Sequence, residues 1–196
     1  SSHIKYGEAN AVLAGDALQA LAYEIIVNDN FLSADEKVNA IDLLSKACGK
    51  NGMVLGQYLD IENENNQDID LKKLDDIHNL KTGKLIECAV MLGQIGSNLE
   101  SESLNVLRDF SSKIGLAFQI TDDILDVTQM ESILGKNKNS DAKNNKLTYI
   151  DIIGLGEARL KANKLTDSAL NSLNKSNITN IDKLVEMAKY LISRES

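Results

Sequence analysis

Three aspartates close an otherwise apolar stretch that reads G-L-A-F-Q-I-T-D-D-I-L-D-V, Gly115–Val127. On a helix, at about 100° per residue, Asp122 and Asp126 lie only about 40° apart and Asp123 lies about a quarter turn away. Carboxylates gathered beside apolar side chains repel one another unless a positive charge lies between them. Their oxygens suit a hard divalent ion such as Mg²⁺, which keeps waters and is commonly completed by substrate phosphates. The stretch therefore predicts a magnesium site. For a bare D-D-x-x-D the alternative is a solvated helix end, so the rest of the chain has to support the metal.

The composition indicates that helices position these acids. The chain has 196 residues, enough for one domain with a sizeable core, and we expect residues 1–196 to form a single all-α domain. It contains no proline, and its aromatic content is only 4%. Long stretches rich in Ala, Leu, Ile and Lys repeat their apolar residues at helical spacing, whereas strand signals are weak.

Charge and cysteine content narrow the classes of partner and compartment. A net charge of −8 argues against a nucleic-acid surface. Cys48 and Cys88 match no metal or redox spacing, so buried reduced thiols are expected. We find no signal peptide and no apolar run judged long enough to span a bilayer, and a cytoplasmic location follows as the expectation.

Helix boundaries are expected from caps and breakers. Ser33 followed by Glu36 is a capping box, and Gly15 inside the first helix predicts close packing against another helix or a ligand. A break or bend is expected near Lys81–Gly83. The predicted helices run over Tyr6 to about Asn28, Ser33 to about Cys48, Gly52 to about Glu62, Leu71 to about Ile95, Ser103 to about Val127–Gln129, Tyr149–Leu173 and Ile181–Ile192.

The stretch Gly135–Lys146 is the most polar part of the chain and carries four lysines against one acid. Its composition is typical of a disordered linker. The functional alternative is a mobile lid whose lysines, Lys136 and Lys146 among them, meet phosphates.

Six sequence blocks, in order, resemble the trans-prenyltransferases (polyprenyl diphosphate synthases), and most of all bacterial farnesyl diphosphate synthases. The resemblance spans nearly the whole chain. The blocks are H-I-K-Y-G-E-A-N-A-V-L-A-G-D-A-L-Q-A-L-A-Y at 3–23, G-M-V-L-G-Q-Y-L-D at 52–60, H-N-L-K-T-G-K-L-I at 78–86, the Asp stretch at 115–127, L-G-K at 134–136 and K-L-T-Y-I-D-I-I-G-L at 146–155.

The resemblance implies an isoprenoid synthase-type helical bundle around a central cavity, a homodimer, and Mg²⁺ as cofactor. The implied reaction condenses dimethylallyl or geranyl diphosphate with isopentenyl diphosphate to give farnesyl diphosphate, in isoprenoid biosynthesis. The implied roles are as follows: metal ligation by Asp122, Asp123 and Asp126; diphosphate binding by Lys81, Thr82, Gln119, Lys136 and Lys146; catalysis by Lys81, Gln119 and Asp122.

One departure from the family is large. The family's first Asp-rich motif, its arginines, and the residues that set product length lie upstream of the block that begins at His3. The chain, which opens Ser1-Ser2 without Met, is therefore expected to correspond to the C-terminal two-thirds of a family member and to be inactive alone. Three alternatives stay open: a non-catalytic partner subunit of a heteromeric synthase, a geranylgeranyl diphosphate synthase, and a terpene cyclase on the same fold, against which the K-T-G and lysine blocks count.

Overall fold

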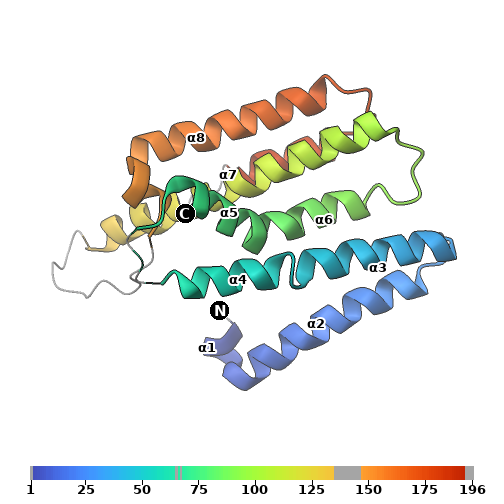
Figure 1. The fold of residues 1–196 in the computed structure, drawn as a ribbon, viewed down its shortest axis with the longest axis horizontal. Coiled ribbons are helices and arrows are strands. Elements are labelled where there is room, and N and C mark those ends of the chain that lie inside the picture. Colours follow the sequence, from blue (N-terminus) through green and yellow to red (C-terminus); the bar gives the residue numbers. More distant parts are fainter. Residues whose placement is uncertain (1, 65, 67, 135–146, 193–196) are drawn as a thin grey trace. The chain divides into compact units, whose positions relative to one another are not determined.

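Helices make up the regular secondary structure of the residues that this computed structural model describes, which are 2–64, 66, 68–134 and 147–192 (Figure 1). For 129–134 only the backbone is described. The all-α class predicted from the sequence is confirmed. The elements are α1 (Ser2–Tyr6), α2 (Glu8–Asn28), α3 (Ala34–Cys48), α4 (Met53–Glu62), α5 (Leu71–His78), the π-helical turn η1 (Asn79–Gly83), α6 (Lys84–Leu92), α7 (Ser101–Leu134), α8 (Tyr149–Asn174) and α9 (Asp182–Ile192).

The chain divides into two compact units, Ser1–Ser45 and Lys46–Ser196. The single domain expected from the sequence stays a prediction. The first unit holds α1, α2 and most of α3. The predicted capping box is present at the start of α3, where the Ser33 backbone N–H donates to Glu36 Oε2 at 2.8 Å and the Glu36 N–H donates to Ser33 Oγ at 3.3 Å.

Helix α2 carries apolar side chains on its exposed surface. No residue of α2 is buried, and Leu18 and Ile25 are more than half exposed. Apart from the backbone of α2 itself and the two adjoining residues, no atom of the described part of the chain lies within 4 Å of where a Cβ on Gly15 would stand, so the close packing predicted for this glycine is not found there.

By length and mean hydropathy, α2 also meets the criterion for a membrane span, with a value of 1.2. This match is weak evidence by length and composition alone, and the expectation that the chain has no membrane span stays a prediction. Core helices of soluble proteins meet it as well, so the finding assigns no location, and the cytoplasmic location stays a prediction.

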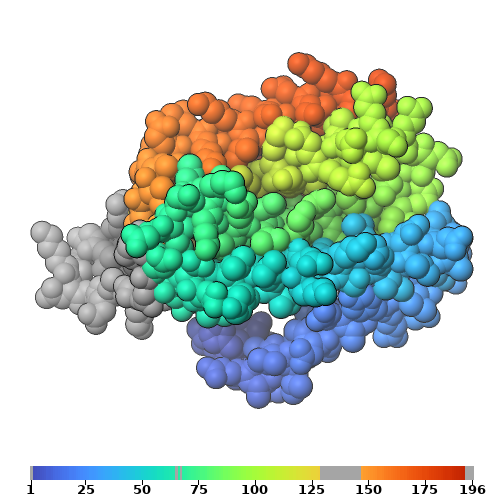
Figure 2. Space-filling model, in the orientation of Figure 1, coloured from blue at the N-terminus to red at the C-terminus, as the bar shows by residue number. Residues whose placement is uncertain are grey.

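The second unit is built around the long helix α7. Helix α8 packs along one side of α7, and α6 packs along another side of α7, as Figures 1 and 2 both show. The core at one end of this pair draws on α5, α7 and α8. Its buried members are Leu74, Ile120, Ile124, Tyr149, Ala158 and Ala162.

The break predicted near Lys81–Gly83 is the π-helical turn η1, which joins α5 to α6. Extra residues in a helical turn re-aim the side chains that follow, and such turns are frequent at functional sites. The turn is held very close to α4, since a Cβ on Gly56 would stand 2.2 Å from the backbone nitrogen of Lys81. It is also close to α7, because a Cβ on Gly115 would stand 2.9 Å from the Gly83 Cα. Small residues at these two crossings bring three elements together.

Helix α8 begins with a complete capping box of its own. The Thr148 side chain accepts from the Asp151 backbone N–H at 3.3 Å, and the Asp151 carboxylate accepts from the Thr148 N–H at 2.8 Å. Gly154, with φ of 78°, bends the helix after its first turn. Such a φ suits glycine, which has no Cβ to clash. The box and the bend fix where Tyr149, the first residue of α8, points.

Candidate active site

The turn η1 presents Lys81 beside α4. The Lys81 Nζ lies 2.5 Å from Asp60 Oδ2, and the Asp60 side chain is only 7% exposed. Asp60 follows Gly56 by four residues, so both face η1 from the same side of α4. The close approach at Gly56 therefore sets the ion pair and with it the position of the Lys81 ammonium group.

The next residue of the turn faces α7. The Thr82 hydroxyl donates to Gln119 Oε1 at 2.9 Å, across 37 residues of sequence. Both side chains are half-buried. The crossing of Gly83 and Gly115, described above, lies one residue and one helical turn away, so the two backbones are near enough for short polar side chains to meet. The structure thus joins two of the predicted diphosphate-binding residues directly.

The three aspartates of α7 have three different environments. Asp122 is half-buried, Asp123 is buried and Asp126 is exposed. Asp123 Oδ2 accepts a hydrogen bond of 3.1 Å from the backbone N–H of Tyr149. Asp122 and Asp126, one turn apart, follow Gln119 along α7 by three and seven residues. The carboxylates therefore begin one helical turn beyond the Thr82–Gln119 contact.

Tyr149 is also held through its side chain, which is fully buried. Its hydroxyl donates to Asp75 Oδ1 at 2.5 Å, and its ring centroid lies 5.4 Å from that of His78. The Lys161 Nζ donates to both oxygens of Asp75 at 2.7 Å and stands 5.0 Å from the centre of the Tyr149 ring. Burial, then the hydrogen bond to Asp75, and then the charges of Asp75 and Asp123 raise the pKa of Tyr149 well above its usual range. The phenol therefore stays protonated and keeps donating.

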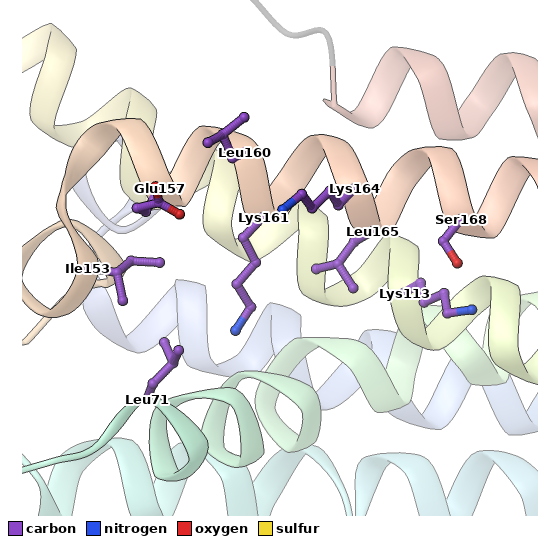
Figure 3. Close-up of a pocket in the computed structure, with 9 residues that line it drawn as sticks. All are labelled: Leu71, Lys113, Ile153, Glu157, Leu160, Lys161, Lys164, Leu165 and Ser168. Carbon is purple, nitrogen blue, oxygen red and sulfur yellow. The ribbon is translucent and has the colours of Figure 1, made fainter.

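A surface pocket of about 410 Å³ lies elsewhere, between α5, α7 and α8 (Figure 3). In Figure 3, Lys161 reaches from α8 across this pocket toward α5. The three aspartates do not line it. Its lining residues are Leu71, Lys113, Ile153, Glu157, Leu160, Lys161, Lys164, Leu165 and Ser168.

The carboxylates of α7 supply part of the ligand set that the predicted magnesium site requires. Within the described part of the chain, no three carboxylate, histidine or cysteine side chains converge closely enough to hold a metal ion by themselves. Mg²⁺ is usually bound through one or two carboxylates, with waters and substrate phosphates filling the other positions. Asp122 and Asp126, on one face of α7, match that smaller requirement, whereas an oxygen of Asp123 is engaged by α8. The residues present fit a magnesium ion that shares its coordination with a phosphate ligand.

Sequence reasoning placed some of these residues and missed others. It singled out Lys81, Thr82, Gln119 and the aspartates, but it did not predict the ion pair between Lys81 and Asp60. The group around Tyr149 was missed. The only sequence signal for it was a tyrosine directly after a capping threonine, with no indication of its partners. Lys136 and Lys146 lie outside the described residues.

Comparisons with known proteins agree with one another. A family model described as polyprenyl synthetase matches residues 1–188. Farnesyl diphosphate synthase of Escherichia coli (strain K12) is 41% identical over 197 residues, which cover 98% of this chain and 66% of that protein. Geranylgeranyl pyrophosphate synthase 11, chloroplastic, of Arabidopsis thaliana is 38% identical over 200 residues, 100% of this chain and 56% of that protein.

The fold of this chain is also similar to that of a solved structure. The geranyltransferase of Helicobacter pylori, complexed with magnesium and isoprenyl diphosphate, matches with a TM-score of 0.75 and 34% identity. The match covers 97% of this chain and 61% of that one. The chain thus spans less than two-thirds of the length of these relatives.

Proposed function

Because the chain belongs to the polyprenyl synthetase family, we propose that the protein it represents condenses an allylic diphosphate with isopentenyl diphosphate, giving farnesyl diphosphate. One observation carries the proposal for these residues. Lys81, Thr82 and Gln119 form adjoining contacts that end one helical turn before the aspartates. A cation, a hydroxyl and an amide in this order suit a diphosphate whose far end meets the metal-binding carboxylates.

The role of the cations is to stabilise the charge that grows on the leaving diphosphate. Lys81 would donate to its oxygens, and Lys136 and Lys146 would join from the polar stretch before α8. Preorganised donors of this kind act where charge develops, and removing one commonly costs about 100-fold or more in turnover. Bound through Asp122 and Asp126, Mg²⁺ would act as a Lewis acid on the same oxygens. Asp123 would tie this motif to α8.

Thr82 and Gln119 would orient the reacting end of the allylic substrate. Their mutual hydrogen bond of 2.9 Å fixes the amide group next to the apolar residues of α7. Loss of diphosphate leaves an allylic cation, the double bond of isopentenyl diphosphate attacks it, and a proton is then lost from the adduct. Water must be kept from the cation, which the apolar surface of a helical bundle favours.

The relatives carry both farnesyl and geranylgeranyl names, so a geranylgeranyl diphosphate product is the nearest alternative. A homodimer is proposed as well. The exposed apolar surface of α2 supports a second copy as its partner.

The test is turnover by a fusion in which the N-terminal third of the Escherichia coli relative precedes residue 1. It is assayed with Mg²⁺, isopentenyl diphosphate and geranyl diphosphate, and the product is sized by chromatography. We expect a farnesyl product, with losses of about 100-fold for Lys81→Ala and Asp122→Asn. The 196-residue chain alone is expected to give none, because it contains a single D-D-x-x-D.

Two other results would redirect the proposal. If Lys81→Ala and Asp122→Asn both leave the turnover rate of the fusion unchanged, prenyl transfer at this site is refuted. A folded fusion without turnover would favour the partner-subunit alternative, which binds a catalytic chain rather than acting itself.

A further inference from the structure

Asp75 is the centre of a charged cluster that the proposed reaction does not use. It accepts from the Tyr149 hydroxyl at 2.5 Å and from Lys161 Nζ at 2.7 Å through both oxygens. The side chains of Lys161 and Asp75 are 22% and 30% exposed, so this pair is partly withdrawn from water. A charge pair that shares several hydrogen bonds holds its geometry more firmly than a single surface pair.

The cluster connects to the Asp-rich motif through one residue. Tyr149 belongs to the cluster by its hydroxyl and contacts the motif by its backbone, whose N–H donates to Asp123 at 3.1 Å. Both Tyr149 and Asp123 are buried, at 0% and 8% exposure. The capping box of Thr148 and Asp151 satisfies two neighbouring backbone N–H groups, and the Tyr149 N–H is directed to Asp123 instead.

We propose that Asp75, Lys161 and Tyr149 are positioning residues that fix Asp123 against α8 and thereby set the direction in which Asp122 and Asp126 face. The proposal rests on the proposed function, since it concerns the carboxylates of that site. On α7, Asp122 lies about 100° round the helix from Asp123, so anchoring one side chain orients the other. None of the three positioning residues needs to touch the metal or the substrate.

Outer contacts of this kind have measurable effects on metal binding. Removing a direct hydrogen-bond partner of a metal ligand typically weakens metal affinity by about 10–100-fold, and because this cluster acts one contact further out we expect the lower end of that range. Tyr149→Phe removes the hydroxyl but keeps the ring and the backbone N–H. A double variant, Asp75→Asn with Lys161→Met, removes both charges together and leaves neither one unpaired.

Two matched controls lie on the same helices outside the cluster. Asp76→Asn changes the next residue of α5, whose side chain is 62% exposed. Lys164→Met changes an exposed lysine one turn along α8 from Lys161. Combined in one chain, the two control substitutions remove the same pair of charges as the double variant, so net charge cannot account for a difference.

The experiment measures three quantities on the 196-residue chain, well below each variant's melting temperature. They are the ¹³Cγ chemical shift of Asp123, the hydrogen-exchange rate of the Tyr149 amide, and the Mn²⁺ affinity by electron paramagnetic resonance. We expect Tyr149→Phe and the double variant to move the Asp123 signal, to speed amide exchange, and to weaken Mn²⁺ binding about tenfold. The controls should match the unchanged chain within about twofold.

Cluster variants that only lower the melting temperature, with the Asp123 signal, exchange rate and Mn²⁺ affinity unchanged, would overturn the proposal. If the unchanged chain binds no Mn²⁺, the metal site of the proposed function fails instead. The Asp123 signal and the Tyr149 amide then decide the positioning role by themselves: movement in the cluster variants supports it, and no movement overturns it.

Discussion

Replacing Gly56 by alanine would drive α4 into the backbone of η1. The added Cβ would stand 2.2 Å from the Lys81 nitrogen, 2.5 Å from its Cα and 2.7 Å from the Leu80 carbonyl carbon. Ordinary van der Waals contact begins near 3.4 Å, so the two backbones must separate by about 1 Å. All three atoms belong to the main chain, and no side-chain rotation relieves the clash.

The expected cost combines two terms. Overpacking of this kind costs about 1–3 kcal/mol, and a backbone clash belongs at the upper end. Alanine stabilises a helix interior by about 1 kcal/mol relative to glycine, and this gain offsets part of the overpacking cost. We therefore expect Gly56→Ala to lower the free energy of unfolding by about 1–2 kcal/mol. Because Asp60 lies on the same face of α4, the separation also lengthens its contact with Lys81.

Urea denaturation followed by circular dichroism measures the first effect, with Gly156→Ala as the control. Gly156 is exposed within α8, and a Cβ there would meet nothing within 4 Å. That control should gain up to about 1 kcal/mol from helix propensity. The second effect is read in the fusion enzyme, where Gly56→Ala should reduce turnover and Gly156→Ala should not. Equal unfolding free energies for the two variants would refute the close crossing of α4 and η1.

Three further predictions concern other parts of the chain. Thr82→Val and Gln119→Leu should be non-additive in unfolding free energy by about 1 kcal/mol, as a double-mutant cycle in urea would show, since each removes the same hydrogen bond. Burial, with smaller contributions from the charges of Cys48 and Glu87, raises the pKa of Cys88 from 9.0 to about 11. Its contribution to stability is therefore complete below pH 9 and lost as pH rises toward 11, so Cys88→Ala should flatten the fall in unfolding free energy over that range. Sedimentation velocity should give a dimer for the unchanged chain and a monomer for Leu18→Glu, because the charge would lie on the exposed apolar surface of α2.

Local signals in the sequence were sufficient for most of the fold. The Ser33–Glu36 capping box, the helix start at Tyr149 and the break near Lys81–Gly83 all depend on residues within one or two turns of each other, and the structure has all three. The form of the break was not predicted. A π-helical turn and an α-helical bend can form from the same residues, and the structure has the π-helical turn where α4 and α7 come close to it at Gly56 and Gly115.

The aspartates show why the site itself was harder to predict than the helix that carries it. Helical periodicity places Asp122, Asp123 and Asp126 within a quarter turn of one another and treats them as equivalent ligands. What separates them is a set of contacts from residues distant in sequence: Tyr149 lies 26 positions from Asp123, and Asp75 lies 74 from Tyr149. A buried carboxylate must find a donor, and the fold supplies one to Asp123 at the start of α8. One acid of the motif therefore fastens α7 to α8, and only the packing of these helices determines which of the three it is.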